Sequence, residues 1–130
     1  MKYNITLTVA SLLSIVFTTL HLADDIVRGM EKGGLSNLIV VPILVIWLYA
    51  TLELTGRRSG YIIIVLGSLL GSVVPVVHFT GAGGVAAGEI AKSGGSLLFV
   101  WTQIALGVTS VYSVILSVRG LWRLGTGQPR

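Results

Sequence analysis

The sequence predicts an all-α integral membrane protein, an antiparallel bundle of four transmembrane helices with both termini on the same, cytoplasmic side. The first observation is composition: of 130 residues, 53% are hydrophobic and 11% are charged, and the mean hydropathy is +0.89. Soluble domains contain about a quarter charged residues, so this chain has too little polar surface to cover a water-soluble globule. The second is that four apolar stretches each reach the roughly 20 residues that a bilayer core requires.

The four predicted spans cover residues 5–27, 35–55, 61–79 and 97–118. Glycine follows the first two spans and serine lies at or just before the start of the last three, which is typical of helix ends. The link Gly56-Arg57-Arg58-Ser59-Gly60 is so short that the second and third spans must form an antiparallel hairpin. Residues 1–130 are therefore expected to form a single four-helix transmembrane domain.

Basic residues set the expected orientation. Six of them fall on one side of the spans, namely Lys2, Arg57, Arg58, Arg119, Arg123 and Arg130, whereas only Arg28, Lys32 and Lys92 fall on the other. Because cytoplasmic loops carry an excess of Lys and Arg, we expect a multi-pass protein of the cell membrane with both termini in the cytoplasm. Phe79, Phe99 and Trp101 are expected in an aromatic belt at the outer interface.

The first span carries a polar stripe along one face. Its members recur at intervals of three and four residues: Ser11, Ser14, Thr18, His21, Asp25 and Arg28. A charged side chain near the middle of a membrane helix costs about 2.5–3.5 kcal/mol on insertion scales, so the stripe should face the protein interior. Asp24 and Arg28 are spaced as an i, i+4 ion pair, and Asp25, at the negative end of the helix dipole, needs a positive group or a cation beside it.

The third span brings a second histidine to the same depth. Spans one and three run in the same direction, and His21 and His78 each lie within roughly 9 Å of the end of their span, at 1.5 Å rise per residue. The sequence Gly67-Ser-Leu-Leu-Gly71 allows another helix to approach closely. Pro42 and Pro75, both toward the outer ends of their spans, make that half less regular.

The fourth span has a small and polar face of its own. Its polar residues repeat every seven positions, at Ser96, Gln103, Ser110 and Ser117, with Gly107 between them. Polar faces on three spans predict a packed bundle with a polar interior.

We therefore predict an outward-opening polar pocket between the first, third and fourth spans that binds a small molecule or a divalent metal. Its expected ligand-binding residues are His21, Asp24, Asp25, Arg28, His78 and Gln103. His21, Asp25 and His78 are the expected metal ligands, because imidazole and carboxylate suit divalent transition metals such as zinc, iron and manganese. The alternatives are a metal-free pocket for an amphipathic molecule and a structural hydrogen-bond network that fixes helix register.

No catalytic residue is identified by a motif. An enzyme acting on a lipid-soluble substrate would use His21 or His78 as the acid or base and Asp25 to orient it. Cysteine is absent, so disulfides, thiolate ligands and a cysteine nucleophile are excluded. The glycine-rich residues 80–95 are either a lid over the pocket or a plain flexible linker.

A different class of function is also open. The chain is expected to contact membrane lipid, and it could be a non-catalytic accessory subunit, packed through the small-residue faces of the third and fourth spans. Such a subunit would form a homo-oligomer or join a larger membrane complex. Nucleic acid is not an expected partner, because the net charge of +4 comes from Lys and Arg at the ends of the spans.

Overall fold

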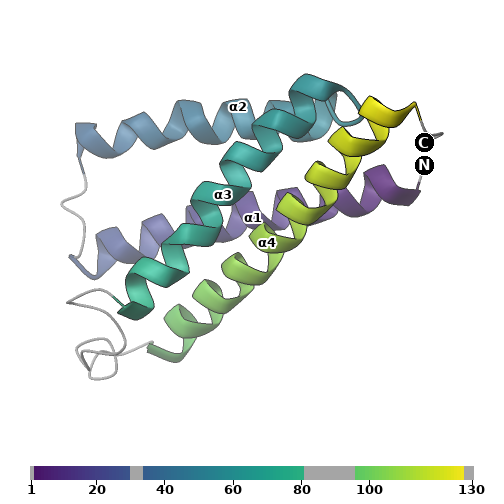
Figure 1. Ribbon diagram of the computed structural model, residues 1–130. Coiled ribbons are helices and arrows are strands. Elements are labelled where there is room, and N and C mark those ends of the chain that lie inside the picture. Colours follow the sequence, from purple (N-terminus) through teal and green to yellow (C-terminus); the bar gives the residue numbers. More distant parts are fainter. Residues whose placement is uncertain (1, 30–33, 81–95, 128–130) are drawn as a thin grey trace.

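The computed structural model describes residues 2–29, 34–80 and 96–127. Its elements are, in order, α1 (Lys2–Val27), the short 3-10 helix η1 (Leu35–Ile39), α2 (Val40–Glu53), α3 (Arg58–Thr80) and α4 (Ser96–Thr126). Consecutive long helices run in opposite directions, and α1 begins where α4 ends (Figure 1). We call that end the terminal end, and the opposite end, where α1 and α3 end and α4 begins, the distal end. The helical fold class predicted from the sequence is confirmed for the described residues.

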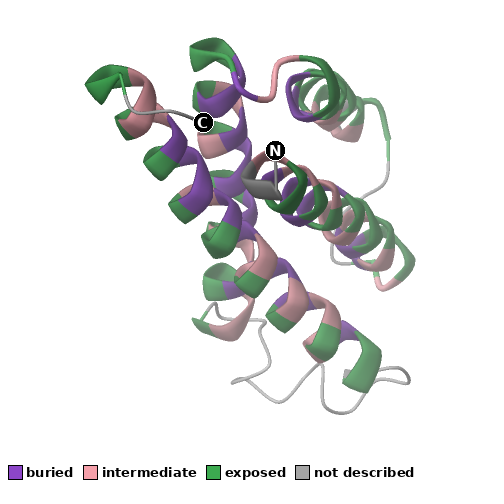
Figure 2. Cartoon of the chain, turned by 90° about the vertical axis from the view of Figure 1, so that its right-hand side faces the viewer, coloured by how far each residue is buried: buried purple, intermediate pink, exposed green. Residues whose placement is uncertain are grey.

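Three of the helices are long and apolar enough to cross a membrane. These stretches are Asn4–Val27, Arg58–Thr80 and Leu97–Thr126, with mean hydropathies of 1.9, 2.3 and 1.6. Buried residues gather on the inner faces of the helices and exposed residues on the outer faces (Figure 2). The outer faces are rich in exposed aliphatic side chains, such as Leu66 and Val108. Length and composition together indicate a membrane protein.

The second predicted span differs from the structure. The sequence predicts one continuous helix over residues 35–55, but η1 precedes α2, and α2 ends at Glu53. Pro42, in the first turn of α2, lacks the N–H that would bond to the carbonyl of Leu38, so the α-helical pattern does not continue back through that residue. At the other end, Gly56 has a positive φ of 94°, which turns the chain into α3.

The fourth helix is longer than its predicted span. It continues to Thr126 instead of ending near residue 118. The fall in hydropathy at Arg119 and Arg123 marks the end of the apolar surface, not the end of the helix, because basic side chains are tolerated where a helix leaves the apolar zone.

Small residues let the helices pack closely. A Cβ at Gly71 would lie 2.6 Å from Ser110 Oγ of α4, and one at Gly120 would lie 2.5 Å from the ring of Tyr61. Gly67 faces Trp47 of α2 in the same way. The expectation that Gly67 and Gly71 allow close helix approach is therefore confirmed.

These contacts also bear on the accessory-subunit alternative. Five small or polar side chains of α3 and α4 are fully buried inside the chain itself: Ser68, Gln103, Ser110, Ser113 and Ser117. Helix α4 packs along both α1 and α3, whereas α2 packs mainly against α3. These side chains are thus covered by the protein's own helices, and the contact with a partner stays a prediction.

A hydroxyl cluster joins α1 to α2. The indole Nε1 of Trp47 donates to Ser11 Oγ at 2.9 Å, and Ser11 Oγ lies 2.7 Å from Thr51 Oγ1. All three side chains are buried. Part of the predicted α1 stripe therefore holds α2 in place.

Candidate metal centre

The parallel helices α1 and α3 bring two imidazoles together at the distal end. The ring centroids of His21 and His78 lie 4.6 Å apart, and the rings meet edge to face at an interplanar angle of 76°. The expectation that these two side chains share a depth and converge is confirmed. Helix geometry accounts for it, since both residues precede the ends of helices that run in the same direction.

Asp25 lies between the two imidazoles. Its Oδ2 atom is 3.2 Å from His21 Nε2 and 3.4 Å from His78 Nε2. The i, i+4 spacing within α1 places Asp25 on the same face as His21, and only 5% and 7% of these two residues are exposed. The positive or hydrogen-bonding group that Asp25 requires is thus supplied by two imidazole rings.

The three side chains have the spacing of a metal site. One ligand atom from each of His21, Asp25 and His78 lies within 4.8 Å of the others. Tetrahedral ligands about 2.0 Å from a metal are separated by about 3.3 Å, and both contacts of Asp25 Oδ2 are already close to that value. A small inward movement of the two imidazoles would complete the set, and three protein ligands leave a fourth position open.

Gln103 contacts the cluster from the α4 side. Its Nε2 atom lies 2.7 Å from Nδ1 of His21. An amide nitrogen only donates, so Nδ1 accepts and the ring proton lies on Nε2, toward Asp25. The other amide atom, Oε1, is buried without a hydrogen bond in the described part of the chain. Turning the amide by half a turn would let Oε1 accept from Nδ1–H and free the Nε2 lone pair for a metal.

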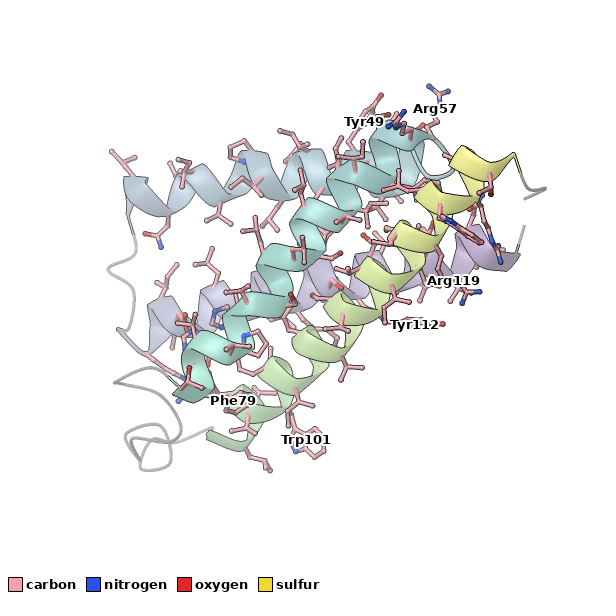
Figure 3. The ribbon with its side chains drawn as sticks, in the orientation of Figure 1. Tyr49, Arg57, Phe79, Trp101, Tyr112 and Arg119 are labelled. Atoms are coloured by element: carbon pink, nitrogen blue, oxygen red, sulfur yellow. The ribbon has the colours of Figure 1, made fainter. Side chains whose placement is uncertain are left out.

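Phe99 is a residue of the site that the sequence did not reveal. It was expected in the outer aromatic belt with Phe79 and Trp101, which do lie at the distal end (Figure 3). Instead, Phe99 is only 2% exposed, and its ring centroid lies 6.3 Å from that of His21 and 5.5 Å from that of His78. It covers both imidazoles from the α4 side.

Asp24 and Arg28 lie beside the cluster and not within it. Arg28 Nε donates to Asp24 Oδ2 at 2.6 Å, which confirms the predicted i, i+4 ion pair. The guanidinium carbon of Arg28 also lies 5.3 Å from the ring centroid of Phe99. Neither residue belongs to the group of three converging ligand atoms, and the expected contact of both with a ligand other than a metal stays a prediction.

A cavity of about 300 Å³ adjoins the metal-ligand cluster, but it differs from the predicted pocket in place and in polarity. The expected pocket lay between the first, third and fourth spans and was polar, whereas this cavity lies between α1, α2 and α3. The side chains of α4 pack tightly over the cluster, so the space remains on the α2 side. The cavity is lined by Thr18, His21, Leu22, Asp25, Val40, Ile43, Leu44, Trp47, Leu70, Gly71, Val74 and His78, most of which are apolar.

The glycine-rich segment predicted as a lid falls almost wholly outside the described residues. Only Thr80, the last residue of α3, belongs to the described part of that segment. The lid therefore stays a prediction.

The chain was compared with protein-family models, with curated proteins and with solved structures, and none of them matches. The function has to come from the geometry and chemistry of the site itself.

Proposed function

We propose that this chain is a multi-pass protein of the cell membrane that binds a divalent transition metal at His21, Asp25 and His78. The observation that carries the proposal is the convergence of three buried ligand atoms, from two parallel helices, within 4.8 Å of one another. Two imidazoles and one carboxylate are a ligand set used by zinc enzymes and by non-haem ferrous proteins.

The energetics of burial favour a bound cation over a purely structural role. A carboxylate in apolar surroundings must be compensated, and a divalent cation bound by Asp25 and the two imidazoles would compensate it. Apolar side chains of similar volume would hold α1 against α3 equally well or better. Metal binding would account for these three buried side chains, whereas helix packing alone does not need them.

The proposed topology is a single four-helix transmembrane domain over residues 1–130, with both termini in the cytoplasm. Arg57 and Arg119 lie at the terminal end, and Phe79 and Trp101 at the distal end (Figure 3). The excess of basic residues at the terminal end supports a cytoplasmic location for it. Helix α2 with η1 is about 31 Å long, from 1.5 Å per α-helical and 2.0 Å per 3-10 residue, which matches a bilayer core of about 30 Å.

Lipid is the proposed partner of the outer helix faces. A homo-oligomer or a larger membrane complex would have to use those lipid-facing surfaces, because the small-residue faces of α3 and α4 are buried inside the chain. We propose no contact with nucleic acid.

Metal binding is tested on the detergent-purified protein. The chain is stripped with a chelator and titrated with Zn²⁺, and bound metal is measured by mass spectrometry of the separated protein. We expect about one zinc per chain, and an affinity at least about 100-fold lower in Asp25→Asn and in His78→Gln, because losing a ligand costs more than the 10–100-fold typical of its supporting partners. Binding should also weaken at acidic pH, since imidazole ligands must be deprotonated.

The matched control is Asp24→Asn, which makes the same chemical change one residue away from the cluster and should leave zinc binding unchanged. Circular dichroism and gel filtration establish that each variant is folded. Substoichiometric zinc in the wild type, or equal zinc in the wild type and His78→Gln, would contradict the proposal and favour the structural network.

A further inference from the structure

The cavity beside the metal-ligand cluster has two chemically different ends. Most of its wall is aliphatic, from Ile43 and Leu44 of α2 and from Leu70 and Val74 of α3, whereas His21, Asp25 and His78 line one end. Its volume of about 300 Å³ is at the lower end of the range for small-molecule pockets, about 300–1,000 Å³. An amphipathic molecule with one small polar group matches this distribution.

Helix α2 is held against α1 and α3 at Trp47, which lies next to the cavity. Trp47 is fixed by its hydrogen bond to Ser11 and by its packing against Gly67. Toward the distal end, α2 lines the cavity with Val40, Ile43 and Leu44.

The cavity is reached through the outer surface of the bundle. Two of its lining residues, Ile43 of α2 and Leu70 of α3, are 42% and 58% exposed. In the proposed topology this surface lies in the bilayer, so a molecule arriving there comes from the lipid phase and carries no net charge.

The polar end of the cavity suits a ligand that carries an oxygen atom. His21, Asp25 and His78 all line the cavity, while Phe99 and Gln103 close the cluster on the α4 side, so the fourth position of a metal held by these three ligands opens toward the cavity. Zinc and iron both accept an oxygen donor there. Without a metal, Asp25 or an imidazole would accept a hydrogen bond from a hydroxyl group.

Trp47 adds an aromatic surface to the wall. Its indole lines the cavity and is otherwise buried. Aromatic rings prefer offset or edge-to-face contact with one another, so a ring-bearing molecule fits this wall better than a purely aliphatic one.

We infer that the cavity binds a neutral alkylphenol-type molecule from the bilayer, with the ring among Trp47 and the aliphatic lining and the hydroxyl group at His21, Asp25 and His78. The coordination of the hydroxyl by a metal rests on the proposed function, whereas occupation of the cavity does not.

Trp47 itself can report occupation. The chain has three tryptophans, and Trp101 and Trp122 are exposed on the outer surface, so the background Trp101→Phe/Trp122→Phe leaves Trp47 as the single fluorophore. The probe is 4-bromophenol, whose bromine quenches indole fluorescence on contact. Its matched control is 4-bromotoluene, which has a methyl group in place of the hydroxyl.

The expected result is saturable quenching of Trp47 by 4-bromophenol, with an affinity at least about tenfold higher than for 4-bromotoluene. Val74→Phe, which fills the cavity, should abolish the saturable component, and Leu44→Phe on α2 provides a second filling variant. Val73→Phe is the matched control, because Val73 is its neighbour on α3 but is 55% exposed and does not line the cavity.

Quenching that is linear in probe concentration, or unchanged in both filling variants that remain folded, would overturn the inference. Equal affinity for 4-bromophenol and 4-bromotoluene would overturn the inference that the cavity binds a hydroxyl group at its polar end. Quenching is measured on the chelator-stripped and on the zinc-loaded protein. Saturable quenching in a chain that takes up no zinc would refute the metal centre alone, whereas stoichiometric zinc without saturable quenching would refute the cavity ligand alone.

Discussion

The terminal and distal halves of this bundle are packed by different chemistry. Toward the terminal end, glycines and hydroxyl groups fill the helix interfaces so closely that a Cβ at Gly120 would lie 2.5 Å from the ring of Tyr61. At the distal end, two imidazoles and a carboxylate take the place of the small residues, and a cavity of about 300 Å³ adjoins them. The terminal half is joined by close contacts of small residues, whereas the distal half contains the buried groups that can bind a ligand.

The polar groups of the two halves also differ in what they require. In the terminal half, Thr51 and Thr55 each donate a hydrogen bond to a carbonyl four residues earlier in the chain, which satisfies a hydroxyl group in a membrane helix at little cost. Asp25 has no such local solution, since a carboxylate needs a donor or a cation from outside its own backbone. The comparison teaches that hydroxyl groups here serve packing, whereas the ionisable groups mark the functional end.

The largest effect is expected where the terminal half is closest packed. A Cβ at Gly60 would overlap the carbonyl oxygen of Leu54, a backbone atom that cannot rotate away. Gly60→Ala should therefore lower the free energy of unfolding by up to about 3 kcal/mol, as over-packing of interiors does, measured by denaturation in detergent.

The control for this prediction is Gly125→Ala in the same half. Nothing lies within 4 Å of a Cβ at Gly125, and alanine is the better helix former. A loss of stability in Gly125→Ala equal to that in Gly60→Ala would show that the terminal half is not specifically packed. Zinc binding should survive both changes in folded protein, because the cluster lies at the other end.

An intermediate effect is expected in the layer that supports the cluster. Gln103→Leu removes the amide that contacts His21 Nδ1 and should weaken zinc binding about 10–100-fold, as loss of a residue that orients a metal ligand does. Gln103→Glu retains an acceptor for Nδ1–H and should stay close to the wild type. The measurement is the zinc titration used for the ligand variants.

Ser110→Ala is the control for the effect of Gln103→Leu on zinc affinity. Ser110 lies seven residues beyond Gln103 on the same face of α4 and is equally buried, but it faces Gly71 and not the cluster. Ser110→Ala should leave the zinc affinity unchanged. Equal weakening by Gln103→Leu and Ser110→Ala would mean that the affinity follows bundle stability and not the hydrogen bond to His21.

Helical periodicity accounts for the parts of the site that could be predicted. The inward stripe of α1 and the shared depth of His21 and His78 follow from a rise of 1.5 Å and a turn of 3.6 residues, which do not depend on how the helices are placed. The same reasoning found Gln103 on the inner face of α4. Each of these residues takes part in the cluster.

What the sequence could not indicate is the rotation and tilt of the neighbouring helices. Helix α2 is apolar on every side, so its pattern does not show which face turns inward, and the cavity beside Trp47 was missed for that reason. Phe99 was missed because an aromatic residue near the end of a span fits an interface belt and a buried contact equally well. The two placements differ only in the rotation of α4.

The smallest effect is expected for Asp24→Asn, the change at the aspartate that precedes Asp25. Asp24→Asn removes the ion pair with Arg28, which joins partly exposed side chains at the end of α1, and such pairs contribute about 0.3–0.5 kcal/mol that added salt screens. Asp25→Asn alters a carboxylate that is 5% exposed and contacts both imidazoles. We expect Asp24→Asn to change the unfolding free energy by less than about 0.5 kcal/mol, with the difference vanishing in 1 M salt and the zinc affinity unaltered. A fall in zinc affinity in Asp24→Asn comparable to that in Asp25→Asn would place the functional charge across the whole distal surface instead of in the buried cluster.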